Sequence, residues 1–223
     1  MELSEKWPEV LICFAVKEEA AEFEKVLPRL AGFGNPEILV TGMGRKNSAR
    51  RIDERLEKPA PTLVLTCGFA GALNPELEIG DVVFDADPET GLAEMLQAAG
   101  AESAKFYCAP RVATTAAEKT ALRQSTGADV VEMESAVIRE ICREKKIPSA
   151  TVRVISDTAL QDLPLDFNSL MTLEQTISFS KLALALVKSP GKIPKLMELQ
   201  RHTRFAAQEL AKVLETLLSR RSR

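Results

Sequence analysis

Residues 130–157 read VVEMESAVIREICREKKIPSATVRVISD, and this stretch decides the fold class. The apolar, β-branched run over 128–133 indicates a strand, and apolar residues then recur at three- and four-residue steps, as in an amphipathic helix. Pro148 ends this helix, because proline disfavours helical backbone in the residue before it. The run 150–155 indicates a second strand. The stretch is therefore typical of a β-α-β unit, in which both strands are expected to run parallel in one sheet.

Each of the two expected strands ends at a carboxylate. Glu134 follows the first strand and Asp157 closes the second. Parallel strands bring their carboxyl ends to the same edge of a sheet, and open α/β sheets bind ligands at that edge. We therefore expect both side chains at one ligand site. The alternative for each residue alone is a helix cap or a strand cap, and the spacing leaves that alternative open.

Strand-like and helix-like segments alternate along the first 157 residues. Further strands are expected at 10–16, 37–41, 62–67 and 79–84, and helices at 17–27, 46–56, 92–99, 168–187 and 193–218. This alternation predicts an α/β fold, a three-layer α/β/α arrangement around a mostly parallel mixed central sheet. A chain of 223 residues is expected to form one domain over 1–223.

Five polar or glycine-rich features follow expected strands directly: Glu19, Gly42–Gly44, Gly68–Gly71, Glu134 and Asp157. A glycine turn that opens a helix can hold an anion, or it can simply make a tight turn. An acid in a first helical turn can serve a ligand, or it can complement the helix dipole. Each feature alone has this structural alternative, but their convergence on one sheet edge favours an active site.

Composition excludes several classes of site. The net charge of −3 gives no support to nucleic-acid binding. A single histidine and four widely spaced cysteines offer no zinc ligand set and no Ser-His-Asp or Cys-His arrangement, so we expect no metal and no cofactor. The sequence shows neither a signal-peptide pattern nor an apolar run of about 18–20 residues, and we expect a cytoplasmic protein.

With these residues laid out, the chain resembles the nucleoside phosphorylase and nucleosidase superfamily. The nearest likeness is to the methylthioadenosine/S-adenosylhomocysteine nucleosidases and to the hopanoid-associated phosphorylase/nucleosidase subgroup. The segments that carry the resemblance, in chain order, are FAVKEEAAEF, TGMGRKNSA, TCGFAGALNPELEIGDVV, VATTAAEKTALRQSTGADVVEMES, VRVISD and KIPKLMELQRHTRFAAQEL. Each segment alone is weakly specific, but the ordered set covers most of the chain.

The resemblance implies a role for each candidate residue. Asp157 matches the acid that protonates the purine, and Glu19 matches the carboxylate that positions the attacking water. Glu134 matches the residue that binds the ribose hydroxyls, with Met133 packing beside the sugar. Further substrate contacts are implied for Gly68, Phe69, Ala70 and Ser156.

The implied function is cleavage of the N-glycosidic bond of an adenosine-type purine nucleoside. Phosphorylases of this superfamily hold phosphate with an arginine and a hydroxyl residue, where this chain has Thr66 and Phe69. We therefore expect hydrolysis by a nucleosidase, although Arg45 leaves phosphorolysis by a purine nucleoside phosphorylase as an alternative. A second alternative is a catalytically silent nucleoside-binding protein, because residues 85–110 form a shorter segment than the family pattern.

The C-terminal region is basic, with ten Lys/Arg against three acids in residues 181–223, so the rest of the chain carries −3 − 7 = −10. Basic amphipathic helices can rest on anionic membranes, and we consider a weak membrane-surface contact here. Helix packing with a solvated basic face is the alternative. The resemblance further implies a homodimer or higher homo-oligomer and a part in hopanoid biosynthesis.

Overall fold

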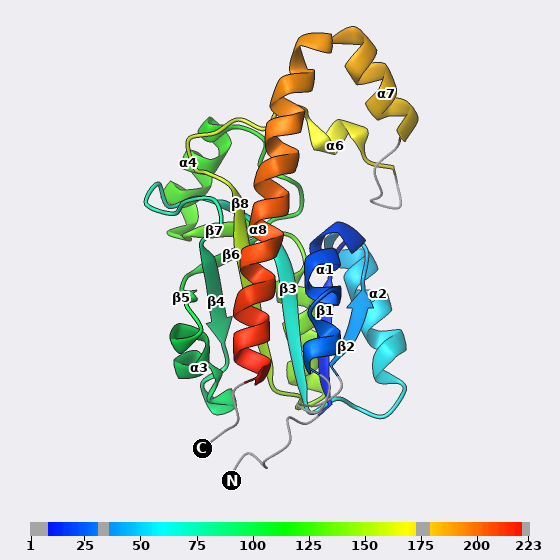
Figure 1. Cartoon of the computed structure of the whole chain (residues 1–223), viewed down its shortest axis with the longest axis vertical. Coiled ribbons are helices and arrows are strands. Elements are labelled where there is room, and N and C mark those ends of the chain that lie inside the picture. The colour runs from blue at the N-terminus through cyan, green and yellow to red at the C-terminus, as the bar shows by residue number, and fades with distance from the viewer. Residues whose placement is uncertain (1–8, 31–35, 173–178, 220–223) are drawn as a thin grey trace.

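The computed structural model of the chain describes residues 9–30, 36–172 and 179–219 (Figure 1). Its strands are β1 (Val10–Phe14), β2 (Glu37–Val40), β3 (Leu63–Ala72), β4 (Val82–Ala86), β5 (Glu102–Ser103), β6 (Phe106–Cys108), β7 (Val130–Glu132) and β8 (Ser149–Asp157). Its α-helices are α1 (Lys17–Glu24), α2 (Gly44–Leu56), α3 (Leu92–Ala98), α4 (Ala116–Thr126), α5 (Ser135–Glu144), α6 (Phe167–Leu170), α7 (Phe179–Lys188) and α8 (Ile193–Ser219). Short 3-10 helices are η1 (Leu27–Leu30), η2 (Pro88–Thr90) and η3 (Pro190–Lys192).

The described strands form one eight-stranded mixed sheet. Its order is β2-β1-β3-β8-β4-β5, and β7 pairs with both β3 and β6. Helices α1, α3 and α8 pack on one face of this sheet, and α2 and α5 pack on the other. The central strands β1 and β8 are buried along their whole length, which explains why they read as nearly continuous apolar runs. The three-layer α/β/α prediction is confirmed.

The β-α-β interpretation of residues 130–157 is wrong in one respect. Strand β8 runs parallel to β3, but β7 runs antiparallel to it, with Val130 opposite Ala72. The reason is the unequal length of the neighbouring strands. Strand β1 pairs with β3 only from Leu63 to Thr66, so the remaining edge of the ten-residue β3 is open, and β7 fills it from the opposite direction.

The expected helix over 168–187 is also different. The described part consists of the four-residue α6 and the ten-residue α7, and residues 173–178 lie outside the described residues. The second long helix is confirmed as α8, whose buried residues run from Ala206 to Leu218. Figure 1 shows this part of α8 crossing the face of the sheet, while its N-terminal part extends beyond the sheet together with α7. Within the described ranges, no helix combines the length and the apolar character that a membrane span requires.

The packing of α8 generates a stability prediction. Leu214 is fully buried between α8 and the sheet, and we expect Leu214→Ala to lower the free energy of unfolding by about 2–5 kcal/mol, because the lost side chain leaves a cavity. Leu184 in α7 is 54% exposed, and Leu184→Ala should change stability by no more than about 0.5 kcal/mol. Urea denaturation of both variants measures the difference. Equal losses would contradict this assignment of buried and exposed helix faces.

Candidate active site

A cavity of about 170 Å³ lies at the carboxyl ends of β3 and β8. Its walls come from these strands, from β7 and the start of α5, and from the segment before α4. The lining residues are Phe69, Ala70, Gly71, Arg111, Val112, Ala113, Val131, Glu132, Met133, Glu134, Ser156, Asp157 and Leu163. Six of the eight residues expected to form the site therefore line one cavity, and the other two, Glu19 and Gly68, lie directly behind Phe69.

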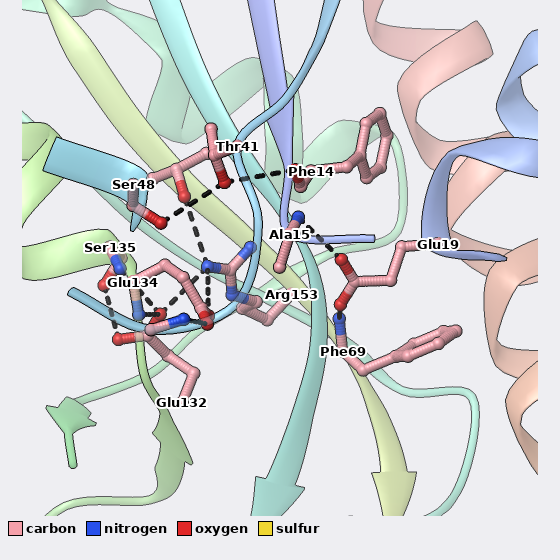
Figure 2. Close-up of polar contacts among 12 residues, drawn as sticks. Phe14, Ala15, Glu19, Thr41, Ser48, Phe69, Glu132, Glu134, Ser135 and Arg153 are labelled. Atoms are coloured by element: carbon pink, nitrogen blue, oxygen red, sulfur yellow. Dashed lines mark hydrogen bonds and ion pairs between the residues drawn. The ribbon is translucent and has the colours of Figure 1, made fainter. Parts of the chain in front are cut away.

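The Glu19 carboxylate is held by backbone N–H groups from two elements. Its Oε2 accepts hydrogen bonds from Ala15 N (2.8 Å) and Val16 N (3.1 Å), and its Oε1 accepts one from Phe69 N (2.8 Å) (Figure 2). A Cβ atom on Gly68 would lie 2.5 Å from Glu19 Oε1, so only glycine permits this approach. Glu19 therefore lies in the first turn of α1 and also contacts the glycine-rich loop, so its position is compatible with either expected role.

Glu134 meets the other glycine turn. Its Oε1 accepts a hydrogen bond of 2.7 Å from Gly44 N at the start of α2, and Gly44 has a φ of +76°. The positive φ explains the glycine, because other residues rarely adopt this conformation. The helix start at Gly42–Gly44 therefore holds an anion of the protein itself, the Glu134 carboxylate, which is 8% exposed.

A buried guanidinium, that of Arg153 in the middle of β8, lies between these carboxylates. Its Nη2 donates to Glu132 Oε2 (2.9 Å) and to Thr66 Oγ1 (3.2 Å) and lies 3.9 Å from Glu134 Oε2 (Figure 2). Glu132 in turn accepts hydrogen bonds from Glu134 N (2.9 Å) and Ser135 N (2.7 Å), and so caps α5. Through Glu132, Arg153 thus fixes the start of α5, where Glu134 lies.

Two donors of Arg153 have no partner among the described residues. Its Nε and Nη1 are buried and make no hydrogen bond, although a buried donor without a partner is costly. Such donors commonly hold an ordered water or a ligand atom. The electrostatic influence of Arg153 reaches both Glu19 and Glu134.

The carboxylates of this site do not titrate alike. Burial raises the pKa of Glu134 to about 7, against the opposing effect of Arg153, and Glu132 and Glu19 add to the rise. Burial also raises the pKa of Glu19, although Arg153 and the backbone N–H groups oppose it. In Glu132, burial is outweighed by Arg153 and by the hydrogen bonds at the start of α5, so its pKa is lowered. The site therefore places a carboxylate that takes up a proton more readily beside one that stays ionised to lower pH.

Asp157 has a cationic partner that is distant in sequence. Its Oδ2 lies 2.5 Å from Lys119 Nζ of α4, and its Oδ1 accepts a hydrogen bond from Ser156 Oγ (2.8 Å). The Lys119 side chain is fully buried, and Asp157 is 7% exposed. Lys119 is 38 residues from Asp157 in the chain, so this pairing is a contact between distant segments.

Three residues of the site were missed: Glu132, Arg153 and Lys119. For Arg153 the sequence signal that could have pointed to burial with partners is a charged residue inside an otherwise apolar strand. Lys119 lies within a motif that carries the family resemblance, but α4 is polar along most of its length and gives no reason to single it out. Among the described residues, no cluster of His, Cys, Asp and Glu has the arrangement of a metal site.

The opposite pKa shifts of Glu132 and Glu134 predict opposite effects of removing each charge. Because the folded protein binds a proton on Glu134 more tightly than the unfolded chain does, this group's contribution to stability is lost as pH rises through about 7. When the pH is raised from 5 to 8, the free energy of unfolding of Glu134→Gln should therefore increase relative to that of wild type by roughly 2–3 kcal/mol. The lowered pKa of Glu132 has the reverse consequence. Its contribution to stability is present at pH values above the pKa of a glutamate in the unfolded chain, and it is lost in acid.

The free energy of unfolding of Glu132→Gln should accordingly be about 3–5 kcal/mol lower than that of wild type at pH 8, because the substitution leaves Arg153 without its closest carboxylate. The loss should be smaller in acid. Urea denaturation at pH 5 and pH 8 measures both differences. A change of the same sign in the two variants would contradict the assignment.

The chain is similar in sequence to known proteins. A family model described as "Phosphorylase superfamily" matches residues 102–189. Among curated proteins, the chain is 28% identical over 189 residues to the 5′-methylthioadenosine/S-adenosylhomocysteine nucleosidase of Shewanella sediminis, covering 66% of this chain and 79% of that protein. The corresponding nucleosidase of Shewanella piezotolerans is 25% identical over 204 residues, covering 75% of this chain and 87% of that protein.

Solved structures share the fold. A 5′-methylthioadenosine/S-adenosylhomocysteine nucleosidase from Colwellia psychrerythraea, solved in complex with adenine, superposes with a TM-score of 0.70 at 16% identity and covers 97% of this chain and 96% of that chain. Futalosine hydrolase of Helicobacter pylori gives a TM-score of 0.67 at 17% identity, with 95% and 97% covered. At these identities the likeness establishes the fold alone. In sequence and in fold the chain is thus similar to proteins of the phosphorylase superfamily, and among them it resembles the 5′-methylthioadenosine/S-adenosylhomocysteine nucleosidases.

Proposed function

We propose that the protein is a nucleosidase that hydrolyses the N-glycosidic bond of a purine nucleoside of the adenosine type. The observation that carries this proposal is a set of three carboxylates with different surroundings, two of them in the wall of one cavity and the third, Glu19, bonded to the backbone of Phe69 in that wall. Glu19 is held by backbone N–H groups, Glu134 by a helix start, and Asp157 by an ammonium. Cleavage of an N-glycosidic bond needs three such groups, because water must be activated, the sugar cation stabilised and the departing base protonated.

Each carboxylate has surroundings that suit one of these steps. The raised pKa of Glu19, caused by burial, makes it a better base toward a water molecule than an exposed glutamate is. Glu134 lies beside Met133 in the cavity wall and can accept hydrogen bonds from the ribose hydroxyls. Asp157 lies across the cavity on β8 and would deliver a proton to the leaving purine. The unpartnered N–H groups of Arg153 would orient the water.

Electrostatics favours water over phosphate as the acceptor. Thr66 already accepts a hydrogen bond from Arg153, and Phe69 offers only an N–H group, which binds Glu19. Arg153 itself is surrounded by Glu19, Glu132 and Glu134, which would repel a phosphate dianion. Arg45, the possible substitute, is exposed and paired with Glu140 at 2.8 Å.

The surroundings of Met133 support a substrate with a substituent at the 5′ position. Met133 also forms part of a second, larger cavity of about 540 Å³, whose other lining residues are Arg45, Lys46, Ala49, Cys108, Ala109, Pro110 and Ala136. The first cavity alone is smaller than the ~300–1,000 Å³ usual for small-molecule sites. A nucleoside that extends past Met133 would fill both spaces.

The reaction can be tested by measuring base release from a panel of 5′-substituted adenosines, with and without phosphate. We expect release in the absence of phosphate, and we expect Asp157→Asn to lower kcat by about 10²–10⁴-fold, because the departing base then lacks its proton donor. Strict dependence on phosphate would establish phosphorolysis instead. Binding of adenosines by isothermal calorimetry without cleavage of any of them would favour the silent nucleoside-binding protein.

We further propose a membrane contact through the C-terminal hairpin, defined as α7, η3 and residues 193–204 of α8. Apolar side chains on it are exposed to solvent: Leu184, Val187 (79%), Ile193 and Met197 (61%). Residues 179–204 hold six Lys/Arg and one acid, a charge of +5, so the rest of the chain carries −3 − 5 = −8. Exposed apolar side chains flanked by cations suit an anionic lipid surface, whereas two copies of the hairpin would repel each other.

Co-sedimentation with vesicles tests this contact. We expect the protein to bind phosphatidylserine-containing vesicles, to bind phosphatidylcholine vesicles less, and to be released by high salt, because each basic residue near the surface contributes about 1 kcal/mol. Val187→Ser/Met197→Ser should weaken binding, and Leu160→Ser, an exposed leucine outside the hairpin, should not. Binding that is absent or insensitive to salt would contradict the proposal. A cytoplasmic location, a homo-oligomer and a part in hopanoid biosynthesis stay predictions.

A further inference from the structure

Lys119 is a fully buried lysine whose three ammonium hydrogens all meet acceptors. Its Nζ donates to Asp157 Oδ2 (2.5 Å), to the carbonyl oxygen of Thr158 (2.7 Å) and to that of Gln161 (3.1 Å). Asp157 is the only one of these three acceptors that can carry a negative charge, because the other two are backbone carbonyls. A lysine with no exposed surface is rare unless it is paired, and this one is paired with the residue proposed to protonate the base.

Burial restricts the charges that this pair can carry. An ammonium beside a carboxylate is neutral overall, and so is an amine beside a carboxylic acid. An ammonium beside a carboxylic acid would leave an uncompensated positive charge in the protein interior, and an amine beside a carboxylate an uncompensated negative one. The two neutral arrangements differ only in which partner holds one proton. The pair therefore contains a single transferable proton.

We propose that Lys119 is a positioning residue for leaving-group protonation, which holds the Asp157 carboxyl group and shares with it the proton that Asp157 delivers to the purine. This inference rests on the proposed hydrolysis. It adds a residue that acts through Asp157 and has no direct contact with the substrate.

The proton passes from Lys119 through Asp157 to the departing base. A proton moves from Lys119 Nζ to the Asp157 carboxylate, and Asp157 passes it to a ring nitrogen of the departing base as the C1′–N bond breaks and its electron pair goes to the base. The oxygen of water bonds to C1′ and its proton goes to Glu19. The negative charge that the transfer leaves on the Lys119–Asp157 pair is offset first by the positive charge on the sugar and then by the proton on Glu19. The proton held by Glu19 finally leaves to solvent and one from solvent restores Lys119, so that no proton is gained or lost overall.

The geometry around Lys119 supports a positioning role. Its two carbonyl acceptors belong to the turn that follows β8, and this turn is tied to the start of α4 at two further points. Asp162 Oδ1 accepts a hydrogen bond from Ala116 N (2.8 Å), and Leu163 N donates one to the Thr114 carbonyl (2.8 Å). Lys119 therefore joins the helix to the strand end that carries Asp157, and a rotated Asp157 would lose contact with it.

The experiment compares two leaving groups. A purine requires a proton to depart, whereas 4-nitrophenolate departs without one, so 4-nitrophenyl riboside bypasses the general acid. We expect Lys119→Gln, which keeps a hydrogen-bond donor and removes the charge and the mobile proton, to lower kcat for the purine nucleoside by about 10²–10⁴-fold. Its kcat for 4-nitrophenyl riboside should stay close to that of wild type. Equal losses on both substrates, or no loss on the purine, would overturn the proposal.

A double variant supplies a second, independent measurement on the purine nucleoside alone. If Lys119 acts through Asp157, Lys119→Gln/Asp157→Asn should be no slower than Asp157→Asn. Once Asp157→Asn has abolished proton delivery, the loss of Lys119 has no further step to impair. If the kcat losses of the two single variants multiply in the double variant, Lys119→Gln acts through an unrelated structural effect and the proposal is overturned. Lys105→Gln is the matched control, since Lys105 Nζ also donates to a backbone carbonyl, that of Thr126, but is exposed and away from the cavity.

The proposed function and this inference fail in different ways. A wild-type protein that cleaves no purine nucleoside contradicts the proposed function. A wild-type protein that cleaves one, with Lys119→Gln equally active and folded by circular dichroism, contradicts only the role of Lys119.

Discussion

The candidate site depends on one buried ionic interaction, that of Arg153 with the carboxylates around it. Removing a guanidinium from water is costly, and the cost is offset only where the partners are close and well oriented. Glu132 meets this condition at 2.9 Å and uses its remaining hydrogen-bonding capacity to hold the first turn of α5. The orientation of Glu134, which begins that helix, follows from this arrangement. The central charge of the sheet thus positions a side chain with which it has no direct hydrogen bond.

This interaction also separates the chemical properties of neighbouring acids. Glu132 and Glu134 are two residues apart and both buried, yet burial raises the pKa of Glu134 while the contact with Arg153 lowers that of Glu132. One cation cannot neutralise three surrounding carboxylates, so the closest one stays ionised and the others take up protons more readily. A site of this kind suits a neutral substrate that acquires positive charge during reaction, and it is unfavourable for a strongly anionic one.

Much of the fold was predictable because strand ends are marked in the sequence. The apolar runs of β1, β3 and β8 are buried, and the polar residues that follow them lie where a parallel sheet gathers its carboxyl ends. Phe69 and Glu134 line the same cavity, and the two glycine turns contact Glu19 and Glu134. Local sequence was sufficient for these features because each is fixed by residues next to a strand.

The features that were missed depend on contacts between distant segments. Nothing in residues 130–132 reports that β1 leaves part of β3 uncovered, so the reversed direction of β7 was not predictable from the β-α-β pattern. Glu134 nonetheless reaches the same cavity as Asp157, because β7 has only three residues and ends beside the same part of β3. The pairing of Lys119 with Asp157 spans 38 residues and becomes evident only when α4 is placed against the end of β8.

The short helix α6 has a consequence for how the molecule behaves as a whole. Its Asn168 side chain binds both backbone groups of Val112 in the cavity wall, at 2.9 Å each, and Lys181 of α7 donates to the carbonyl oxygens of Ser169 in α6 and of Met171 just after it. Hydrogen bonds through α6 thus join the wall of the cavity to the C-terminal hairpin. A displacement of α7 would strain these bonds, and it would therefore also favour a displacement of Val112.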